Sequence, residues 1–189
     1  MKLIGYFPEF IKRPLRPIYW AIRTSRLSLA IFHRPKKIDL IHKYWEAPDD
    51  GANLPLNYRD ADSARGNLIT EKINKYANTD CNILEIGCNV GRNLKALHSA
   101  GYTKLNGIEI SKNAVNLMKE SYPEMVKNLI IHNKPVESII KEFSQGEFDV
   151  VYTMAVLEHI HTESEWIFSD MVKITKDILI TIEDEHSFG

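Results

Sequence analysis

One stretch decides the fold: Ile83-Leu84-Glu85-Ile86-Gly87-Cys88-Asn89-Val90-Gly91-Arg92-Asn93-Leu94. It begins as a short apolar run, passes through two glycines and continues as a segment of helical character. Gly87 and Gly91 permit backbone angles that other residues avoid, and they let a ligand approach the main chain. A helix that begins just after Gly91 offers unpaired N–H groups and the positive end of its dipole to an anion. The stretch therefore predicts a buried strand, a tight turn and a helix that together bind a ligand.

Downstream of this turn, short apolar runs alternate regularly with amphipathic segments. The apolar runs are residues 82–86, 105–110, 128–132, 148–153 and 177–182. The amphipathic segments are residues 92–100, 111–121, 136–143 and 162–175. Strands that alternate with helices indicate right-handed βαβ units. We therefore predict a Rossmann-like α/β fold, a doubly wound and mostly parallel sheet with helices on both faces, which binds its ligand beyond the carboxyl ends of the strands.

The position of Glu85 separates the ligands that such a turn could hold. Dinucleotide-binding turns carry Gly-x-Gly-x-x-Gly, whereas this turn has Gly-x-x-x-Gly, with Glu85 two residues ahead of it. A carboxylate there would repel a pyrophosphate, but it suits a ligand with an ammonium group, such as S-adenosylmethionine. Glu109 closes the second predicted strand and can accept hydrogen bonds from both ribose hydroxyls. NAD enzymes share that second feature, so Glu109 alone supports either class of ligand.

These residues resemble the class I S-adenosylmethionine-dependent methyltransferases. The loop from Glu85 to Gly91, together with Glu109, matches the first two motifs of that family, and residues 148–160 look like its fourth-strand motif. The resemblance spans roughly residues 62–183. Asn89 replaces the glycine that most members carry in mid-loop, and asparagine tolerates left-handed backbone angles. The sequence around Asn89 also resembles that of methyltransferases of bacterial sugar and surface-glycan pathways.

The resemblance implies S-adenosylmethionine as the cofactor, held by residues that follow the first four strands. Those expected around the methionine part are Glu85, Gly87, Cys88, Asn89 and Gly91. Those expected at the ribose and the adenine are Glu109, Ile110, Val136 and Glu137. Those expected under the sulfonium are Thr153 and Met154. The two residues that could reach the cofactor carboxylate are Arg65 and Arg92.

Acid–base chemistry is expected just after the fourth strand. Glu158 and His159 are the predicted catalytic residues, and His161 is a second candidate base because histidine titrates near neutral pH. The alternative is that His159 is only a packed, hydrogen-bonded side chain. We expect no metal site here, because a His-x-His pair on a loop is usually coincidental.

The expected function is methyl transfer to a small-molecule, sugar or glycan- or lipid-linked acceptor. Two other classes stay open: a non-catalytic binding protein of the same fold, and a nicotinamide-dependent oxidoreductase. The glycine spacing and Glu85 oppose the oxidoreductase. Nucleic acid is not an expected partner, because residues 46–189 are acidic overall and phosphate binding needs positive charge.

The N-terminal part of the chain differs in charge from the rest. The whole chain carries a net charge of -1, but residues 1–45 hold ten Lys or Arg and two acids. We divide the chain into a basic extension and lid, residues 1–60, and an S-adenosylmethionine-binding domain, residues 61–189. Tyr44, Trp45 and Tyr58 either form a lid over the pocket or simply pack the N-terminal segment, and ordinary packing is the slightly favoured alternative. Residues 1–37 either contact the head groups of a membrane or pack against protein.

Composition and chain length supply the remaining expectations. Two cysteines, Cys81 and Cys88, are too few for a disulfide framework, which predicts reduced thiols and a cytoplasmic setting, peripheral at the inner membrane face if residues 1–37 bind lipid. The sequence ends just beyond the fifth predicted strand. We therefore expect the last strands of the family to be missing, and the sheet edge left open would favour a homo-oligomer.

Overall fold

The computed structural model describes residues 38–48, 51–60 and 64–183. The chain divides into two compact units, Met1–Lys36 and Lys37–Gly189. Every element below belongs to the second unit, so residues 38–60 lie in the same unit as the sheet. The membrane or protein contact predicted for residues 1–37 lies outside the described residues.

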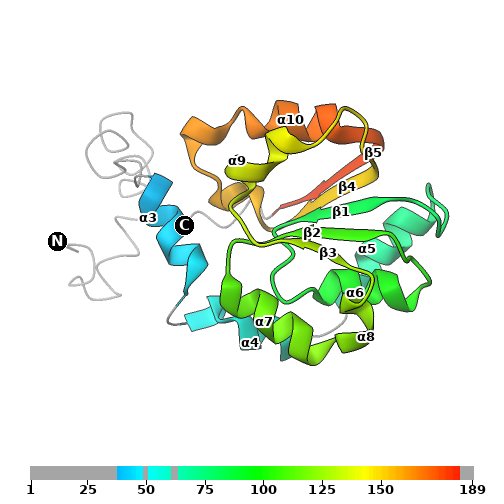
Figure 1. Ribbon diagram of the computed structural model, residues 1–189, viewed down its shortest axis with the longest axis horizontal. Helices are drawn as coiled ribbons and strands as arrows, with labels where there is room; N and C mark the ends of the chain where they lie inside the picture. The colour runs from blue at the N-terminus through cyan, green and yellow to red at the C-terminus, as the bar shows by residue number, and fades with distance from the viewer. Residues whose placement is uncertain (1–37, 49–50, 61–63, 184–189) are drawn as a thin grey trace, which may run out of the picture. The chain divides into compact units, whose positions relative to one another are not determined.

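A parallel sheet of five strands forms the centre of this unit (Figure 1). Its strands are β1 (Ile83–Ile86), β2 (Leu105–Ile108), β3 (Ile130–His132), β4 (Phe148–Met154) and β5 (Thr175–Ile182). They lie in the order β3-β2-β1-β4-β5, and every pairing is parallel. The chain runs outward from β1 to β3 and then returns to the other side of β1, so the order reverses between β1 and β4. The predicted Rossmann-like, doubly wound sheet is confirmed.

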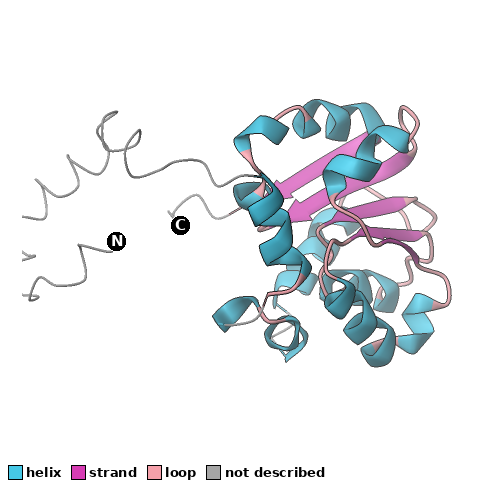
Figure 2. Ribbon diagram, turned by 60° about the vertical axis from the view of Figure 1, so that its left-hand side comes forward, coloured by secondary structure: helices cyan, strands magenta, loops and turns pink. Residues whose placement is uncertain are grey.

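Helices cover both faces of the sheet, as Figures 1 and 2 show. The helices on one side are α5 (Ala64–Asn74), α6 (Arg92–Ser99), α7 (Lys112–Ser121) and α8 (Pro123–Val126). Those on the other side are α9 (Val136–Ile139), the short 3-10 turn η3 (Ile140–Glu142) and α10 (Ile167–Ile174). Among the described residues, no helix is both long enough and apolar enough to cross a membrane.

The alternation of side chains along β1 explains why its residues divide between two cores. Ile83 packs with the helices of the α5–α8 side, whereas Leu84 and Ile86 pack with α9 and α10. Successive side chains of a strand point to opposite faces, so Glu85 must point to the α5–α8 side. The fold therefore forces a carboxyl group into the interior at the end of the central strand.

Five further short segments complete the described part of the chain. Before the sheet come α3 (Ile38–Glu46), the 3-10 turn η2 (Gly51–Asn53) and α4 (Pro55–Asp60). After β4 come the 3-10 turns η4 (Leu157–His159) and η5 (Thr162–Ser164). The predicted segment 162–175 therefore divides into η5, α10 and the start of β5, and its helix begins only at Ile167.

Replacing Gly87 by alanine should destabilise the fold more than the same change at Gly51. Both glycines have a left-handed φ, +72° and +68°, so each substitution costs about 1–2 kcal/mol of backbone strain. At Gly87, however, the new Cβ would lie 2.5 Å from Val156 Cγ2, whereas nothing in the described part of the chain comes within 4 Å at Gly51. We expect Gly87→Ala to lose roughly 1–3 kcal/mol more than Gly51→Ala in urea unfolding. Equal losses would contradict this account.

Candidate active site

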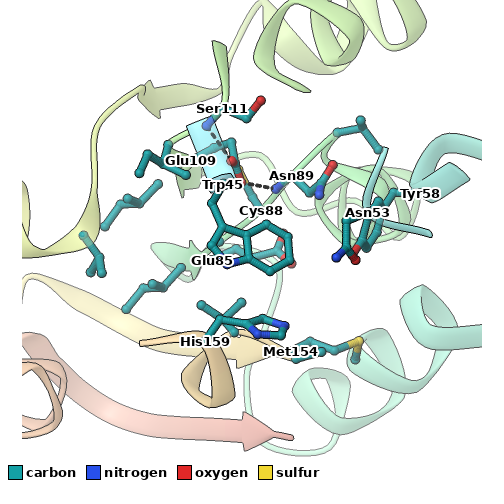
Figure 3. Close-up of a pocket in the computed structure, with 18 of the residues that line it drawn as sticks. Trp45, Asn53, Tyr58, Glu85, Cys88, Asn89, Glu109, Ser111, Met154 and His159 are labelled. Carbon is teal, nitrogen blue, oxygen red and sulfur yellow. Dashed lines mark hydrogen bonds between the residues drawn. The ribbon is translucent and has the colours of Figure 1, made fainter. Parts of the chain in front are cut away.

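A cavity of about 480 Å³ opens at the carboxyl ends of β1, β2 and β4, where the strand order reverses. Parallel α/β sheets bind their ligands at such a point, and this volume lies in the range of small-molecule sites. The loops that follow β1 to β4 form its floor and walls, and residues of α3, η2 and α4 complete the lining (Figure 3). All of the predicted site residues line this cavity except Gly91 and Thr153.

The loop after β1 is held by Glu109, at the end of β2. One carboxylate oxygen of Glu109 accepts the backbone N–H of Asn89 at 2.7 Å, and the other accepts the N–H of Ser111 at 2.7 Å (Figure 3). Asn89 has a φ of +48°, so it adopts the left-handed conformation that the sequence predicts for it. Glu109 therefore fixes both loops beside the cavity, and each of its oxygens keeps a second lone pair for a ligand.

Two predicted cofactor residues lie elsewhere. A Cβ at Gly91 would come 2.9–3.1 Å from the side chain of Met118, so this glycine permits the close packing of α6 on α7 rather than lining the cavity. Thr153 is fully buried, and its hydroxyl donates to Glu183 Oε1 at 2.7 Å. The side chain of Thr153 therefore points toward the end of β5, and Met154 is the one of the predicted pair that reaches the cavity.

Glu183 shapes the loop that follows β4. Its Oε2 accepts the backbone N–H groups of Val156 and Leu157 at 2.8 and 2.9 Å, which satisfies the start of η4. Ala155, the residue before this turn, has a φ of +54°, uncommon for a residue with a side chain. Sequence reasoning missed this role, because nothing in the local pattern links Glu183 to a turn that lies 26 residues away.

Glu85 forms the polar floor of the cavity. It is 2% exposed, and its Oε1 accepts the side-chain amide of Asn93 at 2.8 Å. Its other oxygen, Oε2, has no partner, and neither has Asn93 Oδ1. Burial raises the pKa of Glu85 from 4.5 to about 8, although hydrogen bonds from Asn93 and from the hydroxyl of Tyr152 and the charge of Arg92 oppose the shift. A pKa of about 8 favours the protonated carboxyl at neutral pH, and the buried Asn93 Oδ1 beside it can accept from a ligand donor.

Ile110, Val136 and Glu137 line the cavity after β2 and β3. Glu137 also faces α3, because its Oε1 lies 3.1 Å from Nε2 of His42. Glu137, which is expected at the adenine, is thus in contact with helix α3, which forms the roof of the cavity. Sequence reasoning did not single out His42.

The two arginines considered for the cofactor carboxylate both line the cavity. Arg92 is half-buried in the first turn of α6, and its Nε is buried without a partner. Arg65 lies on α5 and is exposed. Burial raises the pKa of Tyr58, whereas the charges of Arg65 and Arg92 oppose that shift, so the phenol and both cations lie near one another.

The predicted lid is built from α3, η2 and α4. One face of α3 carries Ile41, His42 and Trp45, all of which line the cavity. Tyr58 lines it as well and donates to Asn53 Oδ1 at 3.1 Å. The amide of Asn53 donates in turn to the hydroxyl of Tyr44 at 2.8 Å, which holds α3 against η2. Tyr44 itself is 40% exposed and does not line the cavity.

Of the candidate bases after β4, His159 lines the cavity. Its Nε2 lies 3.3 Å from Glu158 Oε1, and its ring centroid lies 4.6 Å from that of Trp45. Burial lowers the pKa of His159, while the charges of Glu158 and Glu183 oppose that shift. His161 instead is buried outside the cavity, where its Nδ1 accepts the N–H of Glu163 and caps η5. No group of side chains suited to hold a metal ion occurs among the described residues.

This fold and a cavity floored by two carboxyl groups suit a nucleoside with an ammonium group, which is the cofactor of the S-adenosylmethionine-dependent methyltransferases. Residues 83–177, just over half of the chain, match the family described as a methyltransferase domain, and the chain belongs to that family. The predicted class is thereby confirmed, and with it S-adenosylmethionine as the predicted cofactor. The site fits that cofactor, because the buried carboxyl of Glu85 and the unpartnered Asn93 Oδ1 can both accept from an ammonium group.

Parts of the chain are similar in sequence or in fold to known proteins of this class. It is 31% identical over 111 residues to the mitochondrial ubiquinone biosynthesis O-methyltransferase of Dictyostelium discoideum, covering 53% of this chain and 34% of that protein. The chain thus spans about a third of the length of this relative. The magnesium protoporphyrin IX methyltransferase of Synechocystis, solved with bound S-adenosylmethionine, has the same fold, with a TM-score of 0.59 and 16% identity over 77% of this chain and 75% of that one. Monomeric WbdD gives a TM-score of 0.53 and 26% identity over 62% of this chain and 30% of that one.

The raised pKa of Glu85 predicts how the stability of the ligand-free protein depends on pH. Between pH 4.5 and about 8 the folded protein keeps the proton that the unfolded chain has lost. Stability therefore falls as pH rises through this window, by up to about 1.4 kcal/mol per pH unit. Glu85→Gln keeps the shape of the protonated acid but cannot ionise, so the variant should lack this contribution. Urea unfolding at a series of pH values measures the difference, and parallel curves for the two proteins would refute it.

Proposed function

We propose that the protein transfers the methyl group of S-adenosylmethionine to a small-molecule acceptor. The observation that carries this proposal is the cavity that places the buried Glu85 carboxyl and the Glu109 carboxylate side by side at the ends of β1 and β2. The first suits the ammonium of a methionine group and the second suits a ribose.

The residues around these two carboxyls assign a place to each part of the cofactor. The methionine part lies over Glu85 and the loop of Gly87 to Asn89, and its carboxylate faces Arg92 at the start of α6. The half-buried position of Arg92 and its unpartnered Nε favour it over the exposed Arg65. The ribose lies at Glu109. The adenine packs against Ile110 and Val136, with its amino group toward Glu137.

Bound S-adenosylmethionine supplies a methyl group already activated by a cationic sulfur. The chain has to hold donor and acceptor in line and keep water out, and such positioning can supply roughly 7–11 kcal/mol of the barrier. The helix α3 roofs the cavity with Ile41 and Trp45, which is how water is kept out. His159, oriented by Glu158, takes the proton of the acceptor as the methyl group is transferred.

The acceptor atom is proposed to be oxygen. The relative from Dictyostelium is named as an O-methyltransferase, which supports this choice. A neutral imidazole beside the cavity also suits a hydroxyl, because a hydroxyl must lose a proton whereas a carboxylate acceptor need not. Sugars and glycan- or lipid-linked hydroxyls fall within this proposal.

Calorimetry with S-adenosylhomocysteine and with NAD tests the cofactor half of the proposal. The wild type should bind the first and not the second. Glu109→Gln should weaken the binding of S-adenosylhomocysteine about 10- to 100-fold, because it removes charge-assisted hydrogen bonds worth roughly 1.5–3 kcal/mol. Glu124→Gln is a matched control, since Glu124 is exposed and paired only with its neighbour Lys127. Binding of NAD instead, or equal effects of the two variants, would rule the proposal out.

Binding should also release a proton from Glu85. The pKa of about 8 keeps this carboxyl protonated in the empty site at pH 7, and a bound ammonium favours its charged form. Calorimetry in two buffers of different ionisation enthalpy should show the release of close to one proton at pH 7. The affinity should rise with pH between 5.5 and 7.5, by up to about tenfold per unit, while the ammonium of the ligand stays charged. Glu85→Gln should show neither effect, and the same proton count in the variant would exclude Glu85 as its source.

A further inference from the structure

Tyr152 lies beside Glu85 on the neighbouring strand, behind the floor of the cavity. Strands β1 and β4 are adjacent in the sheet (Figure 1), and their register pairs Glu85 with Tyr152. Paired residues of neighbouring strands lie about 5 Å apart and point to the same face, so Tyr152 shares the α5–α8 side with Glu85. The side chain of Tyr152 is fully buried and does not line the cavity. An effect of Tyr152 on a ligand must therefore pass through Glu85.

The hydroxyl of Tyr152 is committed to the Glu85 carboxyl. It hydrogen-bonds this carboxyl, and it has no other partner in the described part of the chain. Burial and the charge of Glu85 raise the pKa of Tyr152 well above its ordinary value, so the phenol keeps its proton at neutral pH. Burying a hydroxyl costs free energy, and a phenylalanine would fill almost the same space without that cost. The hydroxyl therefore points to a role at Glu85.

Several groups around Glu85 act on its charge. Those that are charged or titratable are Tyr152 on β4, Arg92 on α6, Glu109 after β2 and Cys88 in the loop after β1. The thiol of Cys88 is neutral at neutral pH, because burial raises its pKa. The charge of Arg92 favours the Glu85 carboxylate, and that of Glu109 opposes it. The hydrogen bonds come from Asn93 and Tyr152, so two uncharged donors on different elements stabilise the ionised carboxyl.

The binding of an ammonium group depends on the ionised form of Glu85. The empty site favours the protonated carboxyl at neutral pH, and the positive charge of the ligand shifts the equilibrium toward the carboxylate. A hydroxyl that donates to the carboxylate lowers the cost of this ionisation. Together with the amide of Asn93, it also fixes the orientation of the carboxyl at the cavity.

We infer that Tyr152 is a positioning residue for the cofactor, which acts through Glu85 by donating its hydroxyl to the carboxylate that binds the ammonium of S-adenosylmethionine. The part that concerns the cofactor rests on the proposed function, whereas the effect of Tyr152 on Glu85 does not. Tyr152→Phe removes the hydroxyl and keeps the ring. Tyr102→Phe is the matched control, because Tyr102 is also buried but donates to Asn74 Oδ1 at 2.8 Å, outside the cavity.

Urea unfolding of the ligand-free protein at a series of pH values tests the effect on Glu85. The wild type should lose stability as pH rises to about 8, where the loss that is due to Glu85 ends. In Tyr152→Phe the carboxylate lacks a donor, so the pKa of Glu85 should rise and the loss should continue above pH 8. Tyr102→Phe should keep the profile of the wild type, and the difference between the two variants cancels other groups that titrate in this range.

A double variant shows whether Glu85 is the source of this difference. In the Glu85→Gln background, Tyr152→Phe should change the stability by the same amount at every pH, because the residue that titrates is gone. Profiles of one shape for Tyr152→Phe and Tyr102→Phe would overturn the inference. So would a pH-dependent effect of Tyr152→Phe that survives in the Glu85→Gln background.

Calorimetry with S-adenosylhomocysteine at pH 7 and at pH 8.5 tests the role in binding. At pH 7 binding must ionise Glu85, so Tyr152→Phe should weaken it about 10- to 100-fold. At pH 8.5 the Glu85 of the empty wild type is already mostly ionised and hydrogen-bonded, so the loss should be several-fold smaller. Ionisation of the ligand affects all the proteins equally and leaves this comparison intact. Tyr102→Phe should bind like the wild type at both pH values.

The outcomes separate this inference from the proposed function. Binding by Tyr152→Phe that equals binding by Tyr102→Phe, or a loss of one size at both pH values, would show that Tyr152 has no positioning role. Failure of the wild type to bind S-adenosylhomocysteine would contradict the proposed function and, with it, the cofactor half of the inference. The unfolding profiles would still decide whether Tyr152 controls the ionisation of Glu85.

Discussion

The carboxylate of Glu109 is the interaction on which the site depends. With one oxygen on Asn89 N–H and the other on Ser111 N–H, it joins the turn after β1 to the turn after β2. Both turns contain backbone donors that the sheet cannot satisfy, because the strands end at Ile86 and Ile108. The left-handed Asn89 and the close fit of Gly87 against Val156 are tolerable because this carboxylate holds the loop in one conformation. The same group is the one proposed to bind the ribose, so the support of the loop and the proposed binding of the ligand share a single side chain.

Glu85 adds a second constraint, which lowers the stability of the fold, whereas Glu109 stabilises the loops. A carboxyl group buried at the end of a central strand lowers the stability of the ligand-free protein at neutral pH, because its charged form is desolvated. A cationic ligand removes that penalty, so part of the binding free energy of the ligand is the relief of a strain stored in the fold. Asn93 moderates the cost through its 2.8 Å hydrogen bond and so lets the sequence keep an acid where an apolar residue would pack better.

The sequence was informative wherever a pattern was local. Short apolar runs predicted all five strands, and the glycine spacing with Glu85 and Glu109 predicted the turn, the cavity and the class of ligand. Prediction failed where contacts join distant segments. The resemblance to the family placed Thr153 under the sulfonium, but the partner of its hydroxyl is Glu183, which lies beyond β5. Gly91 was assigned to the ligand, although its neighbour is the side chain of Met118 on α7. His42 and Asn53 could not be singled out, because their places beside the cavity depend on how α3 and η2 fold back over the sheet.

The roof of the cavity differs from its floor in how firmly it is anchored. No residue of α3 is fully buried, whereas β1 is buried along its whole length. The free energy needed to detach a segment scales with the apolar surface that it covers, so α3 belongs to the part of the molecule that opens most readily. In the proposed enzyme, one nucleoside would be exchanged for another by detaching this helix, with the sheet left intact.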